Sequence, residues 1–63
     1  MKFKVGDTVK VINTEFSGIG NDKIGRKGEI TRVDKYDEND TLPCEILTEG
    51  FLYWMNESEL ELI

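Results

Sequence analysis

Apolar and polar residues alternate along several short runs of this chain. In the run 8–12, which follows the turn signal Gly6-Asp7, Val9 and Val11 alternate with polar neighbours. A period of two with β-branched residues predicts a strand with one buried face. Four further runs are bounded by turn-forming residues, at 28–33, from Pro43 to a turn at 48–50, at 51–55 and at 60–63. The pattern therefore predicts five short strands.

Two local irregularities refine this prediction. Ile30 and Val33 are three positions apart, which breaks the alternation and predicts a bulge or sharp bend near residues 31–32. Before the last strand, Asn56 is a good N-cap, and Glu59 can return the hydrogen bond in a variant of the capping box. We therefore expect a single helical turn between the fourth and fifth strands.

Two segments have no strand pattern. Residues 13–27 contain several glycines and predict a long irregular loop, which Phe16, Ile19 and Ile24 are expected to pin to the body of the protein. Residues 34–42 are polar and acidic, and we expect a hairpin loop there.

The length of 63 residues predicts one domain, residues 1–63, with an all-β core. Five short strands with one 3₁₀-like turn before the last are the plan of a small barrel, which removes exposed edges by closing. The longest apolar run is far below the roughly 20 residues that span a bilayer, and the first residues lack the apolar segment of a signal peptide. Because Cys44 is alone, no internal disulfide can form, and we expect a cytoplasmic protein.

Charge is unevenly distributed along the chain. Residues 1–35 hold all eight Lys and Arg with five acidic residues, a balance of +3, whereas residues 36–63 hold eight acidic residues and no base, a balance of −8. The net charge of −5 suits solubility. The acidic half is also suited to a basic partner, and the basic half to an acidic one.

Two segments resemble known families. Val5–Ile12 and Gly25–Ile30 resemble the opening of KOW-type and other SH3-like barrels, in which a Gly-Asp turn precedes the first strand. Leu42–Leu47 and Trp54–Leu62 are similar to the C-terminal half of a subgroup that includes photosystem I subunit PsaE, the variable chain of ferredoxin–thioredoxin reductase, and Mib-type and small phage SH3-like domains. The resemblance implies a five-stranded SH3-like barrel that acts as a non-enzymatic module or accessory subunit, and the small size suggests a phage or mobile-element protein.

Catalytic chemistry finds little support in the sequence. Histidine is absent, so the commonest general base and transition-metal ligand are missing, and Cys44 without an activating base is expected to be a core residue. Residues 20–27 have the glycine spacing of a phosphate loop but not its Lys-Ser/Thr pair, and residues 34–41 lack the order of a calcium loop. So small a core is not expected to bury a carboxylate for acid–base work. We predict no catalytic residue, no metal, no cofactor, no small-molecule substrate and no membrane partner.

The aromatic run 51–55 is the best candidate site. If Met55 faces the core, as the resemblance implies, Leu52 and Trp54 point outward, and an exposed Trp is a common anchor at protein interfaces. Coverage of Trp54 by the loop 13–24 or by the turn at 56–59 is the alternative. The expected protein-binding set comprises Trp54, Leu52, Tyr36 and Phe16 as apolar contacts, with Glu45, Glu49 and Glu57 as steering charges.

Nucleic-acid binding is the second hypothesis. A KOW-like module would present basic loop residues to RNA or DNA phosphates. The net charge of −5 opposes this hypothesis. The candidate residues are Lys23, Arg26, Lys27, Arg32 and Lys35.

Overall fold

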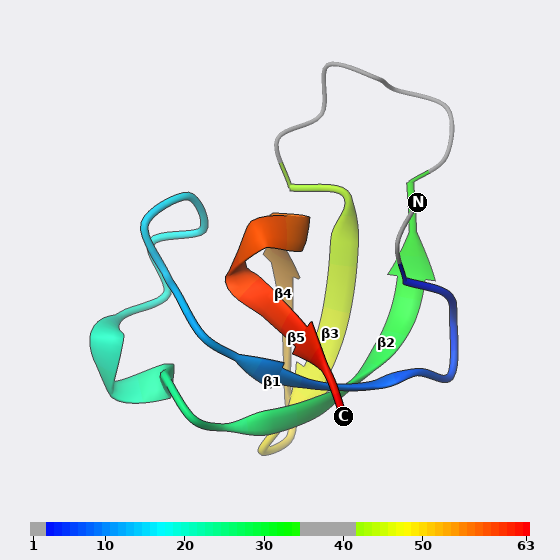
Figure 1. The fold of residues 1–63 in the computed structure, drawn as a ribbon, viewed down its shortest axis with the longest axis horizontal. Coiled ribbons are helices and arrows are strands. Elements are labelled where there is room, and N and C mark those ends of the chain that lie inside the picture. Colours follow the sequence, from blue (N-terminus) through cyan, green and yellow to red (C-terminus); the bar gives the residue numbers. More distant parts are fainter. Residues whose placement is uncertain (1–2, 35–41) are drawn as a thin grey trace.

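The computed structural model describes residues 3–34 and 42–63, which form one antiparallel sheet of five strands in the order β4-β3-β2-β1-β5 (Figure 1). The all-β fold and the 3₁₀ turn before the last strand are confirmed. No helix in these two ranges has the length and apolar character needed to cross a membrane. The elements are β1 (Thr8–Val11), η1 (Asn21–Lys23), β2 (Lys27–Val33), β3 (Cys44–Thr48), β4 (Phe51–Met55), η2 (Glu57–Glu59) and β5 (Leu60–Leu62).

The sheet curls but does not close. The first and last strands lie side by side, since Val9 pairs with Leu62 and Val11 with Leu60. In the described part of the chain, however, the ladder stops at β4 on one side and at β5 on the other. The sheet is therefore partly open: η2 turns the chain away from β4, and the three residues of β5 pair with β1 instead. The arrangement remains compatible with a small barrel that is open along β4.

The core is formed by the inward-facing positions of the strands. On β3, Cys44 and Ile46 are fully buried, which confirms both their shared face and the assignment of the thiol to the core. Phe3 joins them at 3% exposure, although no strand pattern surrounds it. The buried apolar cluster consists of Phe3, Val9, Val11, Ile30, Cys44, Ile46, Met55 and Leu60.

The predicted irregularities in the strands and turns are present. The pairing of β2 with β3 shifts register between Ile30 and Arg32, which confirms the bulge. At η2, the Asn56 side chain accepts a hydrogen bond from the Ser58 N–H, and the Glu59 carboxylate accepts one from the Asn56 N–H, so the capping box is also confirmed. Both features depend on residues that are close together in the sequence, which is why they can be predicted from it.

The loop between β1 and β2 is held differently from the prediction. Ile19 packs against the core as expected, but Phe16 and Ile24 are 56% and 47% exposed. The loop is tied down instead by the fully buried Glu59, whose Oε2 accepts hydrogen bonds from the backbone N–H groups of Phe16 and Ser17 at 3.2 and 3.1 Å. A carboxylate can satisfy several buried N–H groups together, which an apolar side chain cannot do.

Candidate interaction surface

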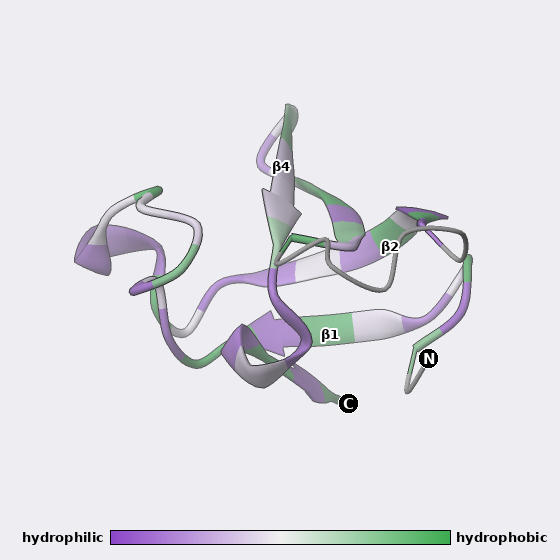
Figure 2. Ribbon diagram, turned by 90° about the horizontal axis from the view of Figure 1, so that it is seen from above, coloured by the Kyte–Doolittle hydropathy of each residue, from purple (hydrophilic) through white to green (hydrophobic). Residues whose placement is uncertain are grey.

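A tight hairpin positions the main candidate residues. Glu49 and Gly50 connect β3 to β4 with positive φ angles of 53° and 83°, as a two-residue turn between twisted strands requires. The turn fixes the register, so that Leu47 lies opposite Leu52 and Glu45 opposite Trp54. The hairpin projects from one side of the molecule (Figure 2).

Three large apolar side chains share the outer face of this hairpin. Met55 is fully buried, so the alternate residues Leu52 and Trp54 point outward, with 57% and 40% of their surface exposed. Leu47, 41% exposed, lies directly across from Leu52 on the same face. Sequence reasoning missed Leu47, although it alternates with the buried Ile46 and Thr48 and its place opposite Leu52 follows from a two-residue turn. We call Leu47, Leu52 and Trp54 the Trp54 patch.

Glu45 borders this patch but is not an exposed charge. The residue is 8% exposed, and its Oε1 accepts a hydrogen bond from the Thr31 hydroxyl at 2.9 Å. The Arg32 Nε lies 3.6 Å from the same oxygen. Because the bulge in β2 brings both partners over β3, Glu45 is held inside the sheet surface, and we remove it from the set of steering charges.

The other predicted contacts are dispersed over the molecule. Phe16 is exposed on the loop whose backbone N–H groups donate hydrogen bonds to the Glu59 side chain of η2. Glu57 is half-buried on η2, and Glu49 in the hairpin turn forms an ion pair with Arg26. Tyr36 lies outside the described residues, as does most of the loop predicted at 34–42. Of the predicted apolar contacts that the structure describes, Leu52 and Trp54 lie together and Phe16 lies on the loop between β1 and β2.

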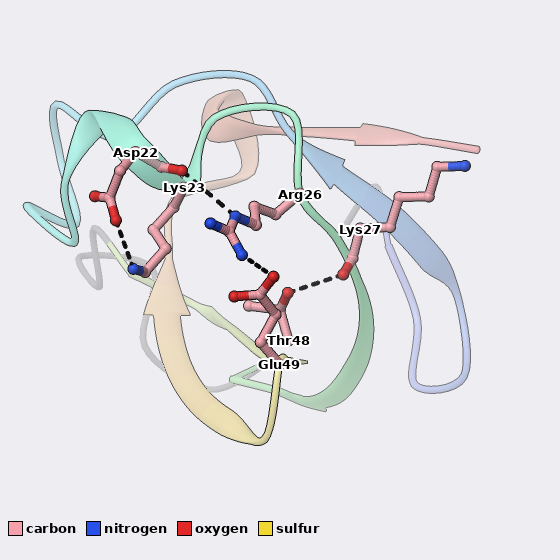
Figure 3. A network of polar contacts seen from close by, with 6 residues as sticks. All are labelled: Asp22, Lys23, Arg26, Lys27, Thr48 and Glu49. Atoms are coloured by element: carbon pink, nitrogen blue, oxygen red, sulfur yellow. Dashed lines mark hydrogen bonds and ion pairs between the residues drawn. The ribbon is translucent and has the colours of Figure 1, made fainter.

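Three of the described basic candidates, Lys23, Arg26 and Arg32, are ion-paired with carboxylates. Lys23 forms an ion pair of 2.8 Å with Asp22, and Arg26 reaches both the Asp22 carbonyl and the Glu49 carboxylate (Figure 3). The hydrogen bond and the charge of Lys23 hold the pKa of Asp22 below its ordinary value. In the same network, the backbone carbonyl of Lys27 accepts a hydrogen bond from the Thr48 hydroxyl at 2.8 Å. This network ties the end of the loop to the β3–β4 hairpin.

The same contacts bear on the nucleic-acid hypothesis. Arg32 is on another part of the sheet, next to Glu45, and Lys35 lies outside the described residues. Of the described candidates, Lys23, Arg26 and Arg32 each face a carboxylate, and Lys27 is exposed. A phosphate would have to replace these partners, so the structure offers little free positive charge for the salt-dependent binding that nucleic acids require.

Metal-ligand groupings and the one fully buried carboxylate can be checked in the described ranges. No group of three or more Cys, Asp or Glu side chains there is placed to hold a metal ion. One described carboxylate is nevertheless fully buried, since Glu59 is inaccessible to solvent. However, its Oε1 and Oε2 both accept hydrogen bonds from this chain, from Asn56 on one side and from Phe16 and Ser17 on the other. Glu59 is therefore a structural anchor.

The described residues define a small all-β protein with five antiparallel strands. No protein-family model and no curated protein matches the sequence. Among solved structures, the chain is similar to the NMR structure of Bacillus subtilis protein YorP, with 23% sequence identity and a TM-score of 0.75. The match covers all of this chain and 71% of YorP. At this level of identity, the similarity concerns the fold.

Proposed function

We propose that this chain is an SH3-like barrel that works as a non-enzymatic, cytoplasmic protein-interaction module. Its partner contacts the Trp54 patch, with Glu49 and Glu57 as the acidic residues nearest the two ends of β4. The observation that carries the proposal is the exposure of three large apolar side chains on one face of a hairpin: 41% for Leu47, 57% for Leu52 and 40% for Trp54.

The energetic reason lies in the small size of the fold. A domain of this length depends on nearly all of its apolar side chains for its core. Full burial of a Leu side chain stabilises a protein by about 1.5–3 kcal/mol relative to full exposure. Leu47, Leu52 and Trp54 stay partly exposed and so forgo part of this stabilisation. A partner that covers the patch recovers this burial, and a Trp at the centre of an interface is a frequent hot spot.

The test is recovery of a partner by the tagged full-length chain, with two matched variants. Trp54→Ala removes the anchor of the patch, and Phe51→Ala truncates another exposed aromatic residue of β4 on the opposite face. We expect Trp54→Ala to weaken binding by about 2 kcal/mol or more, roughly thirtyfold, and Phe51→Ala to retain it. Circular dichroism checks that both variants are folded.

Two results would contradict the proposal. One is a partner that binds wild-type and folded Trp54→Ala protein equally well. The other is recovery of nucleic acid whose binding falls steeply with salt and is lost in Arg26→Glu/Lys27→Glu, which would favour the KOW-like alternative.

A further inference from the structure

β4 is an edge strand of the sheet. Among the described residues it pairs only with β3, and it stands at the outside of the molecule (Figure 2). Edge strands are commonly protected against pairing by Lys, Pro, bulges or covering segments. The run Phe51–Met55 contains neither Lys nor Pro, and its register with β3 is regular throughout. By these criteria β4 remains able to pair with another strand.

The hairpin turn determines which backbone groups face this edge. In a two-residue hairpin the residues that flank the turn exchange hydrogen bonds, and hydrogen-bonded and non-hydrogen-bonded pairs then alternate. The pairs at Phe51, Tyr53 and Met55 are therefore the hydrogen-bonded pairs with β3. The N–H and C=O groups of Leu52 and Trp54 consequently point to the open edge.

The two residues with edge-facing backbone groups are also the two β4 members of the Trp54 patch. An added strand that pairs with Leu52 and Trp54 would place its own alternate side chains on the same outer face, beside these two residues. The backbone thus supplies hydrogen bonds and the patch supplies apolar contacts to one and the same segment. This combination is that of peptide recognition by strand addition.

Charge around the edge favours a basic segment. The described C-terminal part, residues 42–63, holds five Glu and no Lys or Arg. Glu49 lies two residues before β4 and Glu57 two residues after it, so a carboxylate is near each end of the edge. Glu49 is already ion-paired with Arg26, so Lys or Arg at that end would compete with Arg26 for the carboxylate. The net charge of −5 favours a basic incoming segment as a whole.

A second copy of this chain fits the edge less well. Two copies of β4 that pair antiparallel through Leu52 and Trp54 would place Tyr53 on the twofold axis. Glu49 lies in the turn before β4 and Glu57 in η2 after it, so this arrangement would bring the turn of one copy towards η2 of the other at both ends. Each copy also carries a net charge of −5, so the two copies repel each other.

We propose that β4 binds an extended segment of the partner protein as a sixth strand, with apolar residues at alternate positions and Lys or Arg near its ends. This inference rests on the proposed function and specifies how the Trp54 patch is used. The added strand hydrogen-bonds to the backbone of Leu52 and Trp54 and covers their side chains.

A displayed library of random nonapeptides, selected on the full-length chain, tests the inference. Enriched peptides are expected to alternate apolar residues between basic ends. In amide hydrogen exchange, the selected peptide should slow Leu52 and Trp54 by about tenfold or more, whereas Tyr53 and Met55 are already slow in the free protein. N-methylation of alternate peptide nitrogens, on the side that faces β4, should abolish binding.

A pair of variants separates the backbone from the side chain. Leu52→Pro removes one edge-facing N–H without removing a bond to β3, and Leu52→Ala removes only the side chain. We expect Leu52→Pro to bind the selected peptide at least about threefold more weakly than Leu52→Ala, the loss of one hydrogen bond. Glu57→Lys should weaken binding of basic-ended peptides and strengthen binding of acidic-ended ones.

Several results would overturn the inference. The first is enrichment of Pro-rich, helical or acidic peptides. The second is that no peptide is enriched more strongly on the wild-type chain than on the Leu52→Pro variant. The third is binding without protection of the Leu52 and Trp54 amides. A dimer of the free chain with these two amides protected would make a second copy the occupant. If Trp54→Ala still loses the cellular partner in any of these cases, the proposed function stands and only strand addition fails.

Discussion

At the scale of single residues, the buried carboxylate of Glu59 decides how the longest described loop is held. Its Oε2 lies 3.0–3.2 Å from the Ser17 hydroxyl and from the N–H groups of Ser17 and Phe16, while Oε1 lies 2.9 Å from the Asn56 N–H. Every partner is a donor, so both side-chain oxygens of Glu59 act as acceptors. The loop tip, η2 and the end of β4 are thereby joined through one side chain.

This geometry predicts a large effect for Glu59→Gln. The amide nitrogen must face donors on whichever side it occupies, so at least one buried N–H loses its acceptor, at a cost of about 1–3 kcal/mol. Urea unfolding followed by the fluorescence of Trp54 measures the loss. Glu61→Gln is the control. Glu61 is exposed, and its ion pair with Lys10, at 3.7 Å, contributes little to stability. Equal losses in the two variants would contradict the anchoring role.

At the scale of elements, β2 pairs with both β1 and β3. At Gly28, where it contacts both strands, there is no space for a side chain. Gly28 pairs with Val9 on β1, and a Cβ built on it would lie 2.8 Å from the Leu47 carbonyl oxygen on β3. The backbone angle of Gly28 is not in the left-handed region, so space alone imposes glycine. The close approach lets one bent strand take part in both halves of the sheet.

Gly28→Ala should therefore destabilise the fold. A backbone oxygen cannot move aside as a flexible side chain could, so the strands must separate, at a cost of about 1–3 kcal/mol. Thermal unfolding compares this variant with Lys27→Ala, a truncation at the exposed neighbouring position of β2. A Gly28→Ala protein as stable as the Lys27→Ala protein would show that the approach of β2 to β3 is looser than described.

At the scale of the whole molecule, the two parts of the chain that differ in charge are joined by two strand ladders, β2 with β3 and β1 with β5, and by the core that the strands share. Three ion pairs cross between residues 3–34 and 42–63: Lys10 with Glu61, Arg26 with Glu49, and Arg32 with Glu45. Ion pairs at exposed positions contribute little to stability. The pairing of β1 with β5 and the core that these strands share are consequently the main connection between the chain ends.

A comparison of two leucines on β5 tests this balance. Leu60 is 1% exposed and Leu62 is 55% exposed. We expect Leu60→Ala to lose about 2–5 kcal/mol, a large share of the stability of so small a domain, and Leu62→Ala to lose about 0.5 kcal/mol or less. Urea unfolding of both variants gives the difference. Similar values for the two would contradict the described docking of β5 on the core.

The sequence alone determines what depends on neighbouring residues. The alternation around Val9 and Val11, the bulge after Ile30 and the capping box from Asn56 to Glu59 all follow from the preferences of a few consecutive residues. The outward direction of Trp54 likewise follows from strand parity once Met55 is assigned to the core.

Only the tertiary structure decides what depends on residues far apart in the chain. Glutamate is a residue type usually found at the surface, yet Glu45 and Glu59 are buried. Their hydrogen-bond partners lie far away in the chain, 14 positions for Glu45 and 42–43 positions for Glu59. The open edge at β4 is also a tertiary outcome, because strand propensities do not say whether a curled sheet closes. The physical reason is that local preferences act through bonded neighbours, whereas burial and pairing depend on which distant groups can satisfy a donor, an acceptor or an apolar surface.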